Sequence, residues 1–360
     1  MNAVYVHIPF CRHICSYCDF CKVLHIKTFV DDYLDALQQE ILNTYDGEII
    51  KTIYVGGGTP SCLTHNERKK LFRILENFNK APDIEFSFEI NPEDITEDLL
   101  DDIVAGGVNR VSLGVESFNK NNLAFLERKM NYDDLEEKIQ LLRNRGLDNI
   151  NLDLMYAIPG EKMAALKKDI NNLLKLNPTH ISTYSLIIEE HTKLSNNNTE
   201  YISEDEDRKM YDYICKTLEK HGYNHYEVSN FAKDGYESKH NLTYWLNQEY
   251  YGFGLGASGF KGGVRYTNTK NLSEYINNRF RKEQLLLTIK DQMDNELMLG
   301  FRLLKGIDIN AFYDKYGKNI QEVYPVEPLI KDKLLIYKNG YLYISPKYIY
   351  TMNEILTKLI

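Results

Sequence analysis

Short apolar runs rich in β-branched residues alternate with amphipathic stretches through the first half of the chain. The runs expected to form strands cover residues 4–8, 52–55, 84–90, 110–115, 150–155 and 180–186. Between them, residues 29–45, 65–78, 96–105, 132–145 and 162–176 carry apolar side chains at helical spacing. Six such β–α repeats predict a parallel sheet with right-handed crossovers. The pattern alone leaves an open sheet, a closed barrel and an incomplete barrel as alternatives.

The rhythm changes after about residue 190. Residues 192–203 are polar and rich in asparagine, which predicts a surface loop, and residues 204–221 and 285–304 are expected to be helical. Near the C-terminus, Asn339 and Gly340 separate two β-rich runs and predict a hairpin turn. We therefore expect a β/α domain over residues 1–190, an α/β extension over 191–283 and a small helical, winged-helix-like domain over 284–360.

Composition places the chain among ordinary globular proteins. It has 360 residues, of which 43% are hydrophobic and 26% are charged. No apolar run approaches the ~20 residues of a membrane-spanning helix, and the N-terminus lacks the features of a signal peptide. We expect a cytoplasmic protein, which leaves peripheral membrane association open. The net charge of −9 argues against DNA or RNA as a partner.

Cysteines are concentrated near the N-terminus in a way that indicates a metal centre. Four of the six lie between residues 11 and 21, whereas a disulfide framework spreads its cysteines along a small secreted chain. Cys11, Cys15 and Cys18 form a CxxxCxxC run. Three thiolates so close together can ligate three irons of a [4Fe–4S] cluster and leave the fourth iron open to a small molecule.

Zinc is the main alternative for these cysteines, because His7, His13 or Cys21 could complete a tetrahedral site. Structural zinc sites, however, usually use pairs of cysteines separated by a dozen or more residues. The iron–sulfur cluster is therefore the preferred interpretation.

Polar groups follow several of the predicted strands. The second strand runs into Gly56–Gly57–Gly58, and glycine allows a ligand to approach the backbone closely. The third, fourth and fifth strands end at Glu89, Glu116 and Asp153. The carboxyl ends of parallel strands form the edge at which barrels of this kind build their sites. We expect these groups to share one site with the cluster.

CxxxCxxC after a strand, preceded by HIPF, resembles the radical S-adenosylmethionine superfamily. The resemblance covers nearly the whole chain and narrows to the coproporphyrinogen III dehydrogenase-like group, through YVHIPFCRHICSYCDF, YVGGGTP, FEINPED, NRVSLGVESF, NLDLMYAIPG, HISTYSLIIEE, YEVSNFA, HNLTYW and ELMLGFRLLKG. It implies a partial (β/α)6 barrel in which S-adenosylmethionine chelates the open iron. One-electron reduction of the cluster can then cleave the cofactor to a 5′-deoxyadenosyl radical.

The resemblance also implies roles for individual residues. Tyr17 would lie near the adenine, and Asp153 would face a ribose or a second cofactor molecule. The residues expected to line the cofactor site are Tyr5, Tyr17, Gly57, Gly58, Thr59, Glu89, Glu116, Arg128 and Asp153.

Two branches of the group differ in function. One is an oxygen-independent coproporphyrinogen III oxidase, and the other is a heme chaperone that delivers heme to apoproteins and needs an electron donor for its cluster. Three features favour the chaperone: Phe20 stands where the oxidase has a further cysteine, the first strand begins almost at the first residue, and an HNxxYW motif is present. The motif implies heme contacts for His240, Asn241, Tyr244 and Trp245.

Other interpretations stay open at this point. HNxxYW could be a packed turn in which Trp245 fills the core, and Cys21 could be a spectator or a stray ligand. Glu116 and Met130 replace residues that the family commonly has as Gln and His, which leaves cofactor cleavage in more doubt than cofactor binding. A tRNA-modifying radical enzyme is disfavoured by the acidic balance of charge.

Overall fold

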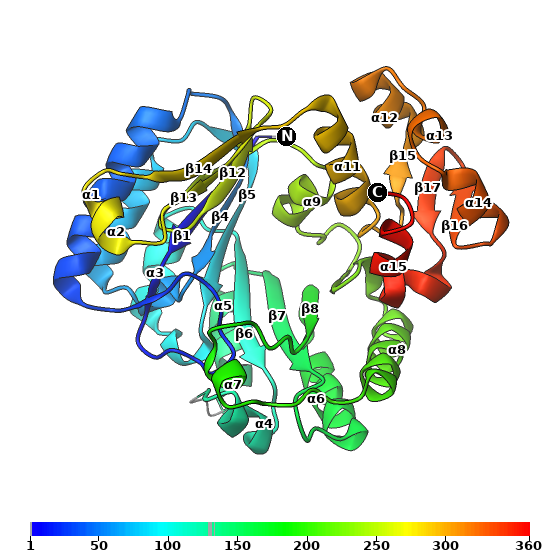
Figure 1. Ribbon diagram of the computed structural model, residues 1–360. Coiled ribbons are helices and arrows are strands. Elements are labelled where there is room, and N and C mark those ends of the chain that lie inside the picture. The colour runs from blue at the N-terminus through cyan, green and yellow to red at the C-terminus, as the bar shows by residue number, and fades with distance from the viewer. Residues whose placement is uncertain (1, 129–131, 133) are drawn as a thin grey trace.

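A computed structural model describes residues 2–128, 132 and 134–360; Met130 lies outside them. One sheet of twelve strands, in the order β14-β13-β12-β11-β1-β4-β5-β6-β7-β8-β10-β9, runs through most of the molecule (Figure 1). Its centre is the predicted set of six parallel strands: β1 (Ala3–Ile8), β4 (Ile50–Gly57), β5 (Lys80–Ile90), β6 (Arg110–Glu116), β7 (Asn149–Tyr156) and β8 (His180–Ser185). β1 and β8 do not pair with each other, so the barrel is open.

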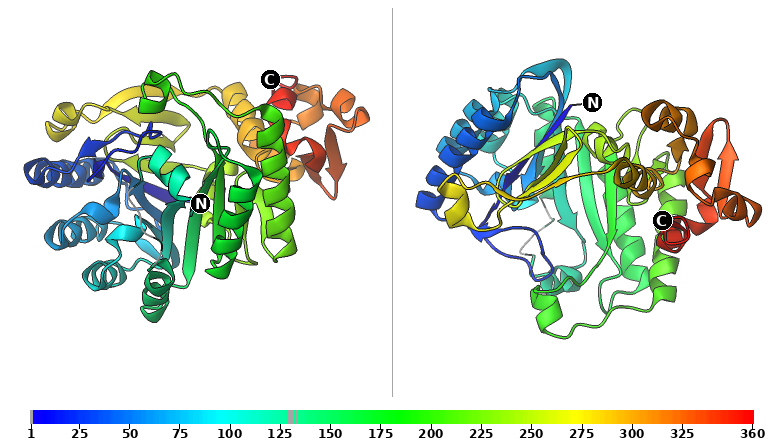
Figure 2. Two further views of the ribbon diagram at one scale, coloured as in Figure 1. Left: turned by 90° about the horizontal axis from the view of Figure 1, so that it is seen from below. Right: turned by 45° about the horizontal axis from the view of Figure 1, so that its top comes forward.

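Helices cover the outer, convex side of these strands (Figure 2). They are α1 (Lys27–Thr44), α2 (His65–Leu75), α3 (Glu97–Ala105), α4 (Lys120–Phe125), α5 (Leu135–Asn144) and α6 (Met163–Lys175). The start of α3 has the usual capping chemistry, since Thr96 accepts a hydrogen bond from the backbone N–H of Leu99 at 3.3 Å. The order of strands and helices confirms the predicted β–α repeats.

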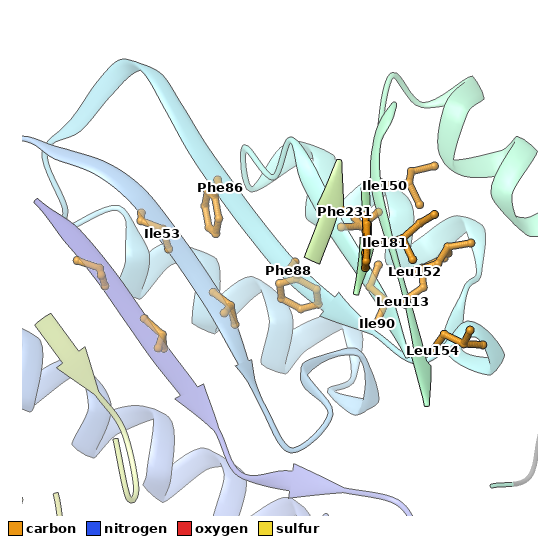
Figure 3. Packing of buried hydrophobic residues seen from close by; sticks show 14 of the residues in the cluster. Ile53, Phe86, Phe88, Ile90, Leu113, Ile150, Leu152, Leu154, Ile181 and Phe231 are labelled. Atoms are coloured by element: carbon orange, nitrogen blue, oxygen red, sulfur yellow. The ribbon is translucent and has the colours of Figure 1, made fainter. Parts of the chain in front are cut away.

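The core lies between the sheet and these helices. Residues at alternate positions of the central strands point outward and are fully or almost fully buried, among them Ile53, Phe88, Leu113, Leu152 and Ile181 (Figure 3). Because side chains alternate between the two faces of a strand, the positions between them face the inside of the barrel. Those inward positions supply the polar groups of the site.

Both edges of the sheet are extended by strands that the sequence pattern did not predict. Beyond β8 lie β10 (Asn230–Ala232) and β9 (Asn224–Glu227), and beyond β1 lie β11 (Tyr250–Phe253), β12 (Ser258–Lys261), β13 (Val264–Asn268) and β14 (Arg281–Leu286). β11 is parallel to β1, and the further strands are antiparallel. The segment expected to be helical from residue 285 therefore begins as a strand.

The remaining helices connect and close the fold. The Asn-rich segment contains the single-turn helix α7 (Lys193–Asn196), and α8 (Glu204–Lys220) follows as predicted. α9 (Lys239–Trp245) lies inside the curve of the sheet, at the end opposite the carboxyl edge (Figure 1). α10 (Leu272–Ile276) packs on α1.

The C-terminal domain has the element order expected of a winged helix. It contains α11 (Ile289–Gly300), β15 (Ile307–Asp308), α12 (Ile309–Tyr316), α13 (Ile320–Val323), α14 (Val326–Lys331), β16 (Leu335–Lys338), β17 (Tyr341–Ile344) and α15 (Met352–Leu356). Asn339 and Gly340 join β16 to β17 with φ values of 52° and 81°, which fits the predicted two-residue turn.

Candidate functional site

One cavity of about 400 Å³ opens at the carboxyl ends of β4 to β8, beneath the cysteine loop. It brings together residues from five strands and from the loops that follow them. Of the residues expected to hold the cluster and the cofactor, it is lined by Cys11, Cys15, Tyr17, Cys18, Gly57, Gly58, Thr59, Glu89, Glu116, Arg128 and Asp153. Tyr5 lies outside the lining, where its hydroxyl is 2.9 Å from His7 Nδ1.

A short pairing of β2 (Phe10–Cys11) with β3 (Val23–Leu24) holds the base of the cysteine loop. Cys11 is buried, and the hydroxyl of Thr59 donates to its Sγ at 3.5 Å. Burial raises the pKa of the Cys11 thiol to about 11, and it raises the pKa values of Cys15 and Cys18. In the absence of iron these thiols hold their protons, so metal binding must release them.

The arrangement fits a cluster better than a single metal ion. Within the described residues, no group of three or more His, Cys, Asp and Glu side chains converges on one metal position. In a [4Fe–4S] cubane each thiolate binds a different iron, so the thiolates need only line one cavity, as these three do.

Of the three residues that could have completed a zinc site, His7 and Cys21 do not line the cavity, whereas His13 does. His7 contacts Tyr5 through Nδ1 and the carbonyl of Cys21 through Nε2, at 2.7 Å. His13 Nε2 lies 3.9 Å from Glu127. Cys21 packs against Gly256, where a Cβ in place of the glycine hydrogen would lie 3.1 Å from its Sγ, and it is not among the residues that line the cavity.

The tri-glycine turn is explained first by contacts within the protein. A Cβ on Gly56 would lie 2.6 Å from the carboxyl carbon of Glu89, and one on Gly57 would lie 2.4 Å from the ring of His7. Gly57 also has a φ of 116°, and its N–H donates to Glu89 at 2.9 Å. Glycine is therefore required here to seat Glu89, whether or not the turn also meets a ligand.

Two acidic groups of the cavity have pKa values near neutrality. Glu89 accepts hydrogen bonds from Gly57 N–H and from the Tyr54 hydroxyl at 2.9 Å, but burial dominates and raises its pKa to about 7. Burial also raises the pKa of Glu116 to about 7, against the attraction of Arg128 and a hydrogen bond from Tyr17 at 3.2 Å. Glu116 has a φ of 65° beside an irregularity in the pairing of β6 with β7.

Arg128 links the cysteine loop to this acidic group. Its guanidinium donates to Asn91 Oδ1 at 3.2 Å and to the carbonyl of Gly114, and it lies 3.9 Å from Cys15 Sγ. A fixed positive charge in this position can attract both a thiolate-bound cluster and an anionic ligand group.

Deeper in the cavity, the lining includes polar residues that come before the strand ends and that the strand ends alone do not predict. Asp153 accepts from Ser112 at 3.2 Å and from Asn151 at 2.8 Å, and burial raises its pKa. Ser112 stands four positions before Glu116, and Asn151 stands two before Asp153, so period-two alternation along β6 and β7 could have found both. The missed residues that line this inner part are Tyr54, Arg110, Ser112, Asn151, Ser182 and Tyr184. Asn241, predicted as a heme contact, lines it as well.

The HNxxYW motif forms α9, and its side chains diverge. His240 is buried, with Nδ1 2.9 Å from the Thr52 hydroxyl and Nε2 2.8 Å from the Tyr244 hydroxyl. Asn241 lines the inner end of the cluster cavity. Trp245 faces the opposite way, with the guanidinium of Arg302 4.6 Å from its ring centroid.

A second cavity of about 630 Å³ lies between α9 and the C-terminal domain. Trp245 lines it, together with Leu303 and Ile307, and Lys305 and Lys315 supply positive charge. The indole Nε1 of Trp245 is buried and has no hydrogen-bond partner among the described residues. The short helix α9 therefore contributes side chains to both cavities.

Comparison with known proteins agrees with these features. The model of the radical SAM superfamily matches residues 5–173, and that of the HemN C-terminal domain matches residues 287–347. The heme chaperone HemW of Lactococcus lactis is 40% identical over 93% of this chain and 90% of its own length, and that of Bacillus subtilis is 39% identical over 90% and 89%.

A solved structure supports the fold. Coproporphyrinogen III oxidase (HemN) from Escherichia coli superposes with a TM-score of 0.86 and covers 99% of this chain and 89% of its own, at 22% sequence identity. Among the described residues, no helix is long and apolar enough to cross a membrane. With the two domain models and relatives at this level of identity, the chain belongs to the radical SAM superfamily and, within it, to the family of the heme chaperone HemW.

Proposed function

We propose that this protein is a heme chaperone that binds heme, a [4Fe–4S] cluster and S-adenosylmethionine and transfers heme to apoproteins. The observation that carries the proposal is the position of α9. Asn241 on this helix lines the cluster cavity, and Trp245 at its end lines the second cavity. The names of the relatives that are 39–40% identical support the same function.

We assign the cluster to Cys11, Cys15 and Cys18, whose thiols line one cavity. The cluster would supply one-electron reduction of S-adenosylmethionine, and an electron donor is then required. Arg128 holds positive charge beside Cys15, and Glu89 offers a carboxylate seated by Gly57 and Tyr54. These two groups are suited to the carboxylate and the amino group of the cofactor respectively.

We assign the remaining predicted cofactor residues to the same cavity on its geometry. Glu116 and Asp153 offer acceptors for hydroxyl groups such as those of a ribose, and Tyr17 places a ring at the cavity wall. Gly57, Gly58 and Thr59 bring backbone and a hydroxyl group to the same wall. Tyr5 does not line the cavity. We propose that it supports the ring of Tyr54, because the two ring centroids lie 6.2 Å apart.

We propose that heme binds in the second cavity, against Trp245. The cavity volume falls within the range of about 300–1,000 Å³ that is usual for small-molecule sites. An aromatic ring packs well on a porphyrin face, and Lys305 can pair with a propionate. Lys315 is paired with Glu296 at 2.6 Å, so it could reach a propionate only by leaving that partner. His240 has both ring nitrogens hydrogen-bonded, so we propose that His240 and Tyr244 position α9 and that any iron ligation by His240 follows a rearrangement.

An anaerobic hemin titration of the reconstituted protein, followed through the Soret band, tests the proposal. The variants are W245A, which opens the proposed site, and H240A. We expect saturable, stoichiometric binding that weakens about tenfold or more in W245A, since loss of a well-packed aromatic contact costs about 1–3 kcal/mol. F260L provides a matched control, because Phe260 also lines this cavity but belongs to β12.

The outcomes separate the two branches of the family. If W245A binds hemin as tightly as the wild type, heme stays the proposed ligand, but its site lies outside the second cavity. No specific binding by the wild type would contradict the chaperone. It would favour oxidation of coproporphyrinogen III, which a turnover assay with that substrate would then measure.

A further inference from the structure

Arg110 is a buried charge that nothing in the cluster and cofactor assignment uses. It stands at the first position of β6 and is only 2% exposed, and its guanidinium lines the inner end of the cluster cavity. Arginine keeps its charge in proteins, and a buried charge without a partner is costly. A role for this group must therefore account for what balances its charge.

Arg110 has few hydrogen-bond partners among the described residues. Its hydrogen bond, from Nη1 to the Ser87 hydroxyl, is long at 3.4 Å, and its Nε has no partner among the described residues. Arg68 and Arg281, in contrast, form ion pairs with Asp102 and Glu40 at 2.7 and 2.6 Å. Arg110 forms no such pair with any residue that the structure describes.

The charge of Arg110 is partly balanced by Asp153, whose pKa it lowers against the larger effect of burial, although the two groups form no ion pair. Asp153 accepts hydrogen bonds from Ser112 and Asn151. Glu85 accepts from the backbone N–H groups of Lys239 and His240 at the start of α9, at 3.0 and 2.9 Å. The positive charge of Arg110 lowers the pKa values of His180 and His240, in addition to the larger effect of their burial, so these imidazoles are neutral neighbours.

We propose that the inner end of the cluster cavity is a carboxylate-binding subsite with Arg110 as its anchor. A guanidinium binds a carboxylate through two parallel hydrogen bonds. The Nε of Arg110 is buried without a partner among the described residues, so a ligand in the cavity would be bound through the terminal nitrogens. Asn151, Ser182 and Asn241, which line the same end of the cavity, provide neutral polar groups around it. The subsite is separate from Arg128, which lies at the cysteine loop.

Two ligands of this protein could supply the carboxylate, and this part of the inference rests on the proposed function. A tetrapyrrole such as heme carries propionates, and S-adenosylmethionine carries an amino-acid carboxylate. A propionate at Arg110 would place part of the tetrapyrrole in the cluster cavity instead of the second cavity. A cofactor carboxylate there would take the role assigned above to Arg128. Arg110 would bind either carboxylate in the same way. Ligands in which the carboxylate is masked or missing therefore show which of the two molecules supplies it.

The test measures equilibrium binding to the anaerobically reconstituted wild type, R110Q and R110K. Four ligands are compared: hemin, hemin dimethyl ester, S-adenosylmethionine and decarboxylated S-adenosylmethionine. R68Q is the matched control, because it removes another buried arginine, on α2, that does not line the cavity.

We expect R110Q to weaken one carboxylate-bearing ligand at least tenfold while its masked or decarboxylated partner changes less than twofold. The affinity of R110K for that ligand should lie between those of R110Q and the wild type, since lysine keeps the charge but not the paired donors. A loss confined to hemin identifies a propionate, and a loss confined to S-adenosylmethionine identifies the cofactor carboxylate. R68Q should lower stability without changing either affinity.

Equal affinities in R110Q and the wild type for all four ligands would overturn the subsite, as would equal losses for a ligand and its masked form. If R110Q does not fold, the same comparison in R110K decides. Failure of the wild type to bind hemin at all would contradict the proposed function instead, and the S-adenosylmethionine pair would still test Arg110.

Discussion

At the scale of single residues, the cofactor end of the cavity depends on carboxyl groups that titrate near neutrality. Burial raises the pKa values of Glu89 and Glu116 to about 7, although Tyr54 and Tyr17 donate hydrogen bonds to them. An ionised carboxylate can only accept hydrogen bonds, as an amino group requires, whereas a protonated one also donates. Cofactor affinity should therefore depend on pH.

S-adenosylmethionine should bind more weakly as the pH falls below 7. Because Glu89 must lose its proton to accept from the amino group, we expect a loss of about five- to tenfold between pH 7.5 and pH 6. Isothermal titration calorimetry across this range measures it. Since Glu116 has a similar pKa, the profile is repeated in E116Q, which should keep the dependence, and in E89Q, which should flatten it at lower affinity. An unchanged profile in E89Q would contradict this role.

Replacing Cys11 and replacing Cys21 should have different effects on the cluster. Cys11 lines the cavity, whereas Cys21 packs against Gly256, so C11A should abolish the [4Fe–4S] absorbance after anaerobic reconstitution and C21A should preserve it. Iron and sulfide analysis of both variants provides the measurement. Loss of the cluster in C21A would mean that Cys21 is a ligand.

Some residues of the site could be predicted and others could not. Glu89 and Asp153 could be predicted because they stand at strand ends, and all parallel strands present their carboxyl ends at one edge. Residues next to the cysteine run could be predicted as well. Arg110 was missed because it begins its strand, and only the three-dimensional fold shows that the cavity reaches so far in. The opposite directions of Asn241 and Trp245 also depend on where α9 lies.

At the scale of elements, α9 is held by contacts from the strands around it. Glu85 on β5 accepts from two backbone N–H groups at its start, where a negative charge is also favoured by the helix dipole. Thr52 on β4 contacts His240, and the ring of Tyr54 lies 5.2 Å from the His240 ring. Because Tyr54 also donates to Glu89, α9 is in contact with the proposed cofactor site.

H240A should destabilise the protein. The change leaves Thr52 and Tyr244 without their shared partner and opens a cavity, at an expected cost of about 2–4 kcal/mol in the free energy of unfolding. Urea denaturation measures this, with H221A as the control at an exposed histidine. Wild-type stability combined with lost hemin binding would instead indicate that His240 ligates heme iron directly.

The elements themselves were predictable to different degrees. The six parallel strands carry buried apolar runs and alternate with periodic helices, so their order could be predicted. The strands β9 to β13 are short and mostly contain Tyr, Asn or Gly, and β14 is largely charged and polar. All six are recognisable only through their pairing at the edges of the sheet. The C-terminal hairpin was predicted from Asn339 and Gly340, where positive φ values are required.

At the scale of the whole molecule, a buried carboxylate joins the barrel to its added strands. Glu40 on α1 is completely buried, accepts from Tyr275 at 2.6 Å and from Asn268 at 2.8 Å, and pairs with Arg281 at 2.6 Å. The backbone N–H of Gly254 donates to it at 2.9 Å. These contacts tie α1 to β13, α10, β14 and the loop after β11.

E40A should therefore lower the free energy of unfolding by about 3–5 kcal/mol, because it leaves the guanidinium of Arg281 and several donors unpaired. E48A is the matched control. Glu48 pairs with Lys261 at 2.6 Å but is partly exposed, so its loss should cost about 1 kcal/mol or less. Equal effects of the two changes on urea denaturation would contradict a joining role for Glu40.

Because α9 contributes side chains to both cavities, we propose that the state of the cluster cavity governs heme delivery, and heme transfer tests this most directly. Heme-loaded, anaerobically reconstituted protein is mixed with an apoprotein such as apomyoglobin, and transfer is followed through the Soret band. The wild type is compared with the variant in which Cys11, Cys15 and Cys18 are all replaced by alanine. We predict stoichiometric transfer by the wild type and a changed extent or rate in the variant. Transfer that is unchanged without the cysteines would contradict the coupling, and no transfer by the wild type would contradict the chaperone.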